Sequence, residues 1–175
     1  MHGHRYKFLM KCFFRLVIMR SLPPSKSTYI MALLEKQLFV KESTIPGAGK
    51  GLFTKEAIAK GTRIVEYKGR KTTWKEVKND DKNFYIYTIN RNHVIDAQRT
   101  LSALARYAND AKGLTRVKGI TNNCVYANDG HRAFIEAVKN IPAGAEILVD
   151  YTKGYWDVLK ENLKAEKKAA KIKND

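Results

Sequence analysis

The alternation of apolar and polar positions predicts short β-strands over most of the chain after residue 36. The candidate segments are rich in β-branched and aromatic residues and are bounded by Gly, Asn, Asp or Pro. Their irregular spacing argues against the regular strand–helix alternation of a Rossmann fold. We therefore predict a mainly β (α+β) domain with strands at residues 37–41, 63–67, 84–89, 94–96, 124–127, 133–137 and 146–149.

Helical patterns are confined to short connections and to the end of the chain. Residues 155–171 contain no Gly or Pro and are rich in Ala, Lys, Glu and Leu, which favour helix. Within this stretch, Trp156, Leu159 and Leu163 fall on one helix face. We expect an amphipathic C-terminal helix with a basic tail over residues 155–175. Two shorter helices are predicted at residues 74–78 and 100–107.

Residues 1–30 differ in composition from the rest, because they carry basic residues and no acidic one. Their apolar stretch, residues 8–19, is interrupted by Lys11 and Arg15. It therefore lacks the unbroken apolar run of a secretory signal and the ~20 apolar residues of a membrane span. We interpret residues 1–30 as a basic extension that is disordered or mis-assigned, with Met31 as the natural start. A basic amphipathic segment on a membrane surface is the alternative, and we expect a cytoplasmic protein.

The bulk composition is that of one globular domain with a basic surface. The chain has 175 residues, of which 44% are hydrophobic, enough for a single core. The net charge of +16 favours an acidic partner such as nucleic acid, although a solvated basic surface gives the same number. Cys12 and Cys124 are too few for a disulfide framework or a thiolate zinc cluster. No metal site is expected, because the histidines are dispersed at His2, His4, His93 and His131.

Four short motifs follow one another in a fixed order. They are Gly-Ala-Gly-Lys-Gly-Leu-Phe (residues 47–53), Glu-Tyr-Lys-Gly (66–69), Ala-Arg-Tyr-Ala-Asn-Asp-Ala (105–111) and Gly-Ala-Glu-Ile-Leu-Val-Asp-Tyr (144–151). Each has an ordinary explanation, since glycines permit a tight hairpin as readily as a ligand loop, and Asn-Asp favours a turn. The glycine motif lacks both the dinucleotide pattern Gly-x-Gly-x-x-Gly and the Gly-Lys-Ser/Thr of a P-loop. Only the order and spacing of the whole set are specific.

In this order and spacing, the motifs resemble the SET domain, the fold of most protein lysine methyltransferases, over residues 37–157. The resemblance implies a β-clip-like arrangement of several small sheets with a knot-like crossing near the active site. The chain is similar to the minimal bacterial or viral type, because it lacks the cysteine-rich flanks common in the family. The resemblance further implies S-adenosylmethionine as the cofactor and a protein lysine side chain as the methyl acceptor.

The resemblance also implies which residues bind the cofactor. The glycine loop would lie against S-adenosylmethionine through backbone near Lys50 and Leu52, and Asn109 matches an asparagine that contacts the cofactor. Asp110 stands where histidine is usual, and an insertion around residues 112–119 follows it. The expected cofactor-binding residues are Gly49, Lys50, Gly51, Leu52, Arg106, Asn109, Asp110, Tyr151 and Trp156.

Tyrosines are the expected catalytic residues. By resemblance, Tyr151 is the catalytic tyrosine, and Tyr67 and Tyr85 line the channel that admits the substrate lysine. Tyr87 lies on the same strand face as Tyr85, so either residue suits the channel. Tyr126 matches a tyrosine that limits one subgroup to monomethyl-lysine, which makes monomethylation a hypothesis for this chain.

A tyrosine-lined channel suits methyl transfer to an amine. Free lysine has a pKa of ~10.4, so removing its proton at pH 7 costs roughly 4–5 kcal/mol. An apolar channel lowers that pKa by desolvation, and tyrosine hydroxyls orient the neutral amine without adding a fixed charge. In such a site no metal is needed.

The sequence is compatible with two other functions. A catalytically silent SET-fold module that binds a basic protein or a nucleic-acid partner fits the altered Asn109-Asp110-Ala111 segment and the charge. A nucleic-acid-binding protein without a cofactor is the other. Cys124 is interpreted as a small buried thiol and not as a nucleophile, because nothing near it in sequence looks like an activating base.

Overall fold

The computed structural model describes residues 33–80 and 83–174, with side chains as far as residue 165. The chain divides into two compact units at Tyr151, with the strands in one unit and the C-terminal helix in the other. Each unit is considered by itself. The expectation for residues 1–30 lies outside the described residues.

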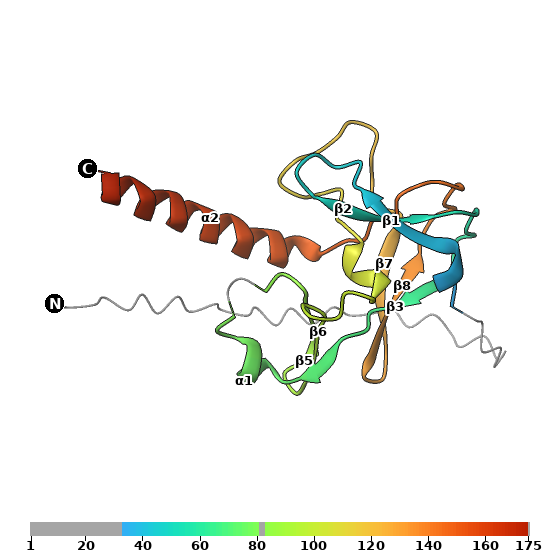
Figure 1. The fold of residues 1–175 in the computed structure, drawn as a ribbon, viewed down its shortest axis with the longest axis horizontal. Coiled ribbons are helices and arrows are strands. Elements are labelled where there is room, and N and C mark those ends of the chain that lie inside the picture. Colours follow the sequence, from blue (N-terminus) through green and yellow to red (C-terminus); the bar gives the residue numbers. More distant parts are fainter. Residues whose placement is uncertain (1–32, 81–82, 175) are drawn as a thin grey trace. The chain divides into compact units, whose positions relative to one another are not determined.

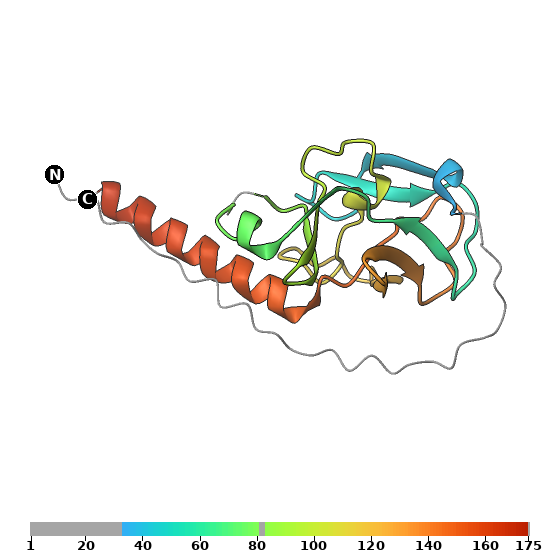
Figure 2. The same cartoon turned by 90° about the horizontal axis from the view of Figure 1, so that it is seen from below.

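The strand-bearing unit is built from small antiparallel sheets, as the prediction of a mainly β fold required. Its described strands are β1 (Leu38–Glu42), β2 (Lys50–Thr54), β3 (Arg63–Glu66), β4 (Arg70–Thr72), β5 (Ile86–Asn90), β6 (His93–Asp96), β7 (Cys124–Asp129) and β8 (Arg132–Ala137). They form a β1-β2 hairpin and two three-stranded sheets in the orders β3-β8-β7 and β4-β6-β5. In Figure 1, and from below in Figure 2, β1 (blue) and β2 (cyan) run side by side.

Four elements differ from the sequence prediction. β2 and β4 were missed, because β2 contains Gly51 of the glycine motif and β4 reads Arg-Lys-Thr without an apolar alternation. Residues 146–149 make isolated bridges in place of a regular strand. Only the end of the helix predicted at residues 100–107 is helical, as the 3-10 turn η2 (Leu104–Tyr107), because Ala103 before it is extended. The predicted helix at residues 74–78 is present as α1 (Trp74–Val77).

The glycine motif forms the turn and the return strand of a hairpin. β1 and β2 pair antiparallel from Leu38 opposite Thr54 to Glu42 opposite Lys50. Gly47 and Gly49 in the connection have φ values of 79° and 68°, a left-handed conformation that glycine adopts without steric cost. The motif therefore forms the tight hairpin that its glycines permit. Gly49 and Lys50 are exposed at the turn of this hairpin.

A single apolar cluster unites the sheets. Leu52 from β2, Ile64 from β3 and Ile135 from β8 are fully buried together with Ile147 and Val149 from the C-terminal motif. Burying such a side chain contributes about 1.5–3 kcal/mol each, so the cluster is the main favourable term for this unit. The motif at residues 144–151 is thus part of the core as well as a candidate for chemistry.

Residues 146–149 cross between segments that are distant in sequence. The Ile147 amide donates to the Leu52 carbonyl (2.7 Å), and the Val149 amide donates to the Asn109 carbonyl (2.8 Å). On the other side, the Cys124 amide donates to the Leu148 carbonyl (2.9 Å). The two ends of the loop from residue 109 to 124 therefore bond to residues 149 and 148. The resemblance to the SET domain implied a knot-like crossing near the active site.

A buried carboxylate fastens the β1-β2 connection to this crossing. Glu146 is 5% exposed and accepts hydrogen bonds from the Ser43 hydroxyl (2.7 Å) and from the Thr44 amide (2.8 Å) and hydroxyl (2.5 Å). The Asn109 side-chain amide is a further donor at 3.3 Å. Buried charges are tolerated when hydrogen-bonded in this way. Gly51 lies directly over the carboxylate, where a Cβ would overlap Glu146 Oε1.

The second unit contains the helix α2 (Thr152–Asn174), which begins three residues before the predicted helix. Thr152 has a φ of 73°, an uncommon conformation for a β-branched residue. Within the helix, Lys153 and Asp157 form an ion pair of 2.5 Å, and the rings of Tyr155 and Trp156 pack edge to face at 5.1 Å. Among the described residues, no helix combines the length and the apolar character needed to cross a bilayer.

Gly51→Ala is expected to lower the free energy of unfolding by about 1–3 kcal/mol, because the added methyl group forces the Glu146 carboxylate out of its site. Urea-induced unfolding measures the change. Gly154→Ala, inside α2, is the matched control and is expected to favour the helix by up to about 1 kcal/mol. A Gly51→Ala protein as stable as the wild type contradicts the close packing of Gly51 on Glu146.

Candidate functional site

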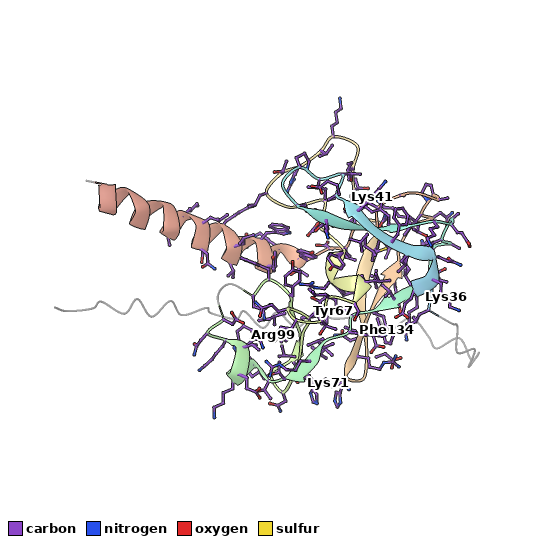
Figure 3. All side chains as sticks on the ribbon, viewed as in Figure 1. Lys36, Lys41, Tyr67, Lys71, Arg99 and Phe134 are labelled. Carbon is purple, nitrogen blue, oxygen red and sulfur yellow. The ribbon has the colours of Figure 1, made fainter. Side chains whose placement is uncertain are left out.

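Three tyrosine rings from three different strands or strand ends form one cluster. Tyr67 directly follows β3, Tyr87 lies in β5 and Tyr126 lies in β7. The ring centroids are 5.7 Å apart for Tyr67 and Tyr87, 5.9 Å for Tyr67 and Tyr126, and 4.7 Å for Tyr87 and Tyr126. Tyr67 lies in the interior of the unit in Figure 3, whereas Lys36 and Lys71 lie at its periphery. The rings form an apolar wall with hydroxyl groups attached.

The hydroxyl groups of Tyr67 and Tyr87 donate hydrogen bonds to other segments of the chain. The Tyr67 hydroxyl donates to the Tyr85 carbonyl (3.1 Å), and the Tyr87 hydroxyl donates to the Asn128 side-chain oxygen (3.0 Å). Burial raises the pKa of Tyr87 to about 12, because the phenolate would lose its hydration. Tyr87 is therefore neutral at physiological pH.

The structure places Tyr87, and not the ring of Tyr85, with Tyr67 and Tyr126. Tyr85 lies one residue before β5, and its ring packs under the Arg106 guanidinium, 3.8 Å from the ring centroid to Cζ. Sequence alternation left both tyrosines open as channel residues, and only the three-dimensional packing separates them. The catalytic role given to Tyr85 stays a prediction.

Arg106 is buried with one unsatisfied donor. Its Nη1 lies 3.4 Å from the Tyr107 hydroxyl and its Nη2 lies 3.3 Å from the Gln98 carbonyl. Its Nε is buried and has no hydrogen-bond partner among the described residues. An unpaired buried donor costs about 1–3 kcal/mol, so this position suits an acceptor from outside the chain.

Tyr151 lies against the segment that carries the Asn-Asp motif. Its hydroxyl donates to the Ala108 carbonyl at 2.6 Å. The adjacent Asn109 donates through its side-chain amide to the Lys50 carbonyl at 3.0 Å. The neighbouring residues Ala108 and Asn109 thus connect Tyr151, the expected catalytic tyrosine, to β2. Motifs that are a hundred residues apart in sequence meet at one place.

Asp110 and Asn123 hold the backbone on both sides of the crossing. The Asp110 carboxylate accepts from the Tyr151 amide at 2.9 Å. The Asn123 side chain donates to the Glu146 carbonyl (2.8 Å) and accepts from the Leu148 amide (2.9 Å), as a strand backbone would. Sequence reasoning missed these uses of Asp110 and Asn123. A signal was present in the run Asn122-Asn123, since amides in a loop often bond to backbone.

The remaining candidates occupy different surroundings. Leu52 is fully buried, and its carbonyl accepts from Ile147, so its side chain belongs to the core. Trp156 lies in α2, and its predicted role at the cofactor stays a prediction. Cys124 is fully buried, and burial raises the pKa of its thiol to about 12, which matches an inert thiol. Among the described residues, no group of three His, Cys, Asp or Glu side chains is arranged to hold a metal ion.

Comparison with known families agrees with this geometry. Small antiparallel sheets around a crossing, with tyrosines gathered beside it, define a SET-type fold. The SET domain family model matches residues 49–152, more than half of the chain. The chain therefore belongs to the SET domain family, in which protein lysine methyltransferases that use S-adenosylmethionine are common.

The free energy of unfolding is expected to fall as the pH rises from about 10 to about 12. Folding raises the pKa of Tyr87 from 10.0 to about 12, so the unfolded chain releases this proton first and alkali favours unfolding. The contribution of Tyr87 to the free energy of unfolding is fully present below pH 10. It is lost as the pH rises through about 12. Urea unfolding of Tyr87→Phe at a series of pH values measures the effect.

The comparison has an internal control, because Tyr87 is protonated in both states at about pH 8. At that pH, the difference in the free energy of unfolding between the wild type and Tyr87→Phe reflects only the hydrogen bond to Asn128. A difference that stays constant up to pH 12 contradicts the burial of the Tyr87 hydroxyl.

Proposed function

We propose that this SET-domain protein is an S-adenosylmethionine-dependent N-methyltransferase that acts on a lysine side chain of a protein. The observation that carries the proposal is the position of the Tyr151 hydroxyl. It is 2.6 Å from the Ala108 carbonyl, and the next residue, Asn109, is bonded to Lys50 of the glycine motif. The candidate for amine orientation and the candidate for cofactor binding are thus joined through adjacent residues.

The residues present fit S-adenosylmethionine. Gly49 and Lys50 are exposed at a turn, and a Cβ at Gly49 would meet no atom within 4 Å, so a ligand can approach this backbone. The unpaired Arg106 Nε suits an acceptor such as a carboxylate or a ring nitrogen. Gly49, Lys50 and Gly51 would hold one part of the cofactor, and Arg106 and Asn109 another.

The chemistry needs a neutral amine aligned with a reactive methyl group. S-adenosylmethionine supplies a methyl sulfonium when bound, and transfer forms the nitrogen–methyl bond as the sulfur–methyl bond breaks. The tyrosine cluster of Tyr67, Tyr87 and Tyr126 supplies apolar surface that disfavours the ammonium form of lysine. The amine proton leaves to water before the transfer.

Tyr151 orients the amine in this proposal. Because its hydroxyl proton is given to the Ala108 carbonyl, its oxygen acts toward the substrate as an acceptor. An amine N–H donated to that oxygen leaves the nitrogen lone pair for the methyl group. The contribution is one of alignment, which is worth several powers of ten in rate when the geometry is held.

Tyr126 supports monomethyl-lysine as the product. Its ring is fixed edge-on against Tyr67 and tilted against Tyr87. A ring held in this way leaves less room for a second methyl group on the amine. The mass of the methylated product distinguishes one methyl group from three.

The net charge of +16 favours the nucleic-acid partner of the second candidate function, a catalytically silent SET-fold module that binds a basic protein or a nucleic-acid partner. Such a module need not transfer methyl groups. The two functions differ in the response to Tyr151→Phe, because partner binding by a basic surface does not depend on that hydroxyl.

Tyr151→Phe is expected to lower methyl transfer about 100-fold, because the amine loses its acceptor while the ring stays in place. Transfer of a radiolabelled methyl group to proteins in a lysate of cells that lack the gene measures activity. Calorimetric titration with S-adenosylhomocysteine measures cofactor binding, which is expected to change by less than about 3-fold.

Thr88→Val is the control, because it removes a side-chain hydroxyl at an exposed position of β5. Full activity in Tyr151→Phe contradicts the role given to this hydroxyl. A wild-type protein that binds S-adenosylhomocysteine but labels nothing supports the silent module.

A further inference from the structure

The Asp110 carboxylate is the centre of a hydrogen-bond network next to Tyr151. It is 4% exposed. Its Oδ1 accepts from the Lys112 amide (2.8 Å) and from the Asn122 side-chain amide (2.7 Å), and its Oδ2 accepts from the Tyr151 amide (2.9 Å). One side chain therefore joins Lys112 and Asn122, which lie at and beyond the two ends of the inserted loop, to the backbone of the expected catalytic tyrosine.

Few side chains can accept three such bonds. A carboxylate has two oxygens and only accepts, whereas a neutral histidine has one acceptor nitrogen and asparagine has one acceptor oxygen. The histidine usual at this position in the family is therefore unable to replace Asp110 in this network. The departure from the family pattern and the insertion that follows it are two parts of one arrangement.

Two further contacts close the loop around the same backbone. The Asn122 side-chain oxygen accepts from the Ala111 amide at 2.8 Å, so Asn122 is fixed at both ends of its amide group. Lys112 forms a 2.5 Å ion pair with Asp150, the residue before Tyr151. The residue after Tyr151, Thr152, has a φ of 73°, a conformation that persists only when its surroundings hold it.

We propose that Asp110 and Asn122 form a clasp that positions Tyr151 for the reaction, and this inference rests on the proposed function. Asp110 acts through the Tyr151 backbone, so it is a positioning residue and not a catalytic one. Its carboxylate is assigned to Tyr151, which leaves only the backbone of residue 110 for a cofactor. The segment of residues 112–122 serves methyl transfer by supplying the backbone amide of Lys112 and the side chain of Asn122 to the clasp.

Asp110→Asn tests the clasp. Asparagine keeps the size of the side chain but replaces one acceptor oxygen with a donor that faces other donors. The apparent kcat of methyl transfer to lysate proteins is expected to fall about 10–100-fold. The apparent KM for S-adenosylmethionine is expected to change by less than about 3-fold, because the cofactor contacts remain. Asp80→Asn, the same substitution at an exposed position, is the matched control.

A second measurement tests the hydrogen bond between Asp110 and the Tyr151 amide independently of methyl transfer. In protein labelled with ¹⁵N-tyrosine, the Tyr151 amide is identified by its loss in Tyr151→Phe. Its hydrogen exchange is expected to accelerate in Asp110→Asn but not in Asp80→Asn, while the other tyrosine amides keep their rates. Faster exchange at all tyrosine amides indicates general destabilisation and overturns the inference.

The outcomes separate the inference from the proposed function. If the wild type is active and Asp110→Asn has the same kcat, the positioning role of Asp110 is overturned and the methyltransferase proposal stays intact. A rise in KM with unchanged kcat also overturns it, because Asp110 then serves the cofactor. A wild-type protein without transfer activity overturns the proposed function, and the positioning role with it.

Discussion

Residues 146–149 exchange backbone hydrogen bonds with three segments that are far apart in the sequence, and the candidate site depends on these bonds. Ile147 bonds to β2, Val149 to Asn109, and Leu148 to Cys124. Each bond contributes only about 1 kcal/mol net. Their effect is mainly one of placement, because they bring the glycine motif, the Asn-Asp motif and Tyr151 to a single point.

Two buried carboxylates, Glu146 and Asp110, join this crossing to other segments of the chain. Glu146 accepts hydrogen bonds from the β1-β2 connection, and Asp110 accepts from the inserted loop and from Tyr151. A buried carboxylate is costly unless it is fully hydrogen-bonded. The network around each therefore admits few other arrangements of the loops it joins. Tyr67 belongs to the apolar cluster that contains Ile147 and Val149, and Tyr87, Tyr126 and Tyr151 pack against that cluster.

Local patterns predicted much of this fold, and long-range contacts account for what they missed. The strands at β7 and β8 and the C-terminal helix follow from apolar alternation and helix propensity. β2 was missed because Gly51 disfavours a strand unless close packing requires glycine, and Glu146 provides that packing. For the site, the sequence singled out Tyr67, Tyr126 and Tyr151. The hydrogen bond from the Tyr151 amide to Asp110 spans 41 residues, and the one from the Thr44 amide to Glu146 spans 102, so no local pattern indicates them.

Hydrogen exchange with and without S-adenosylhomocysteine tests most directly whether the crossing builds a cofactor site. The account predicts slower exchange at residues 47–54 and 104–111, the two segments joined by the bond from Asn109 to Lys50. The sheet of β4, β6 and β5 is predicted to exchange at an unchanged rate. Exchange unaffected by S-adenosylhomocysteine in both segments, or slowed only in that sheet, would contradict the account.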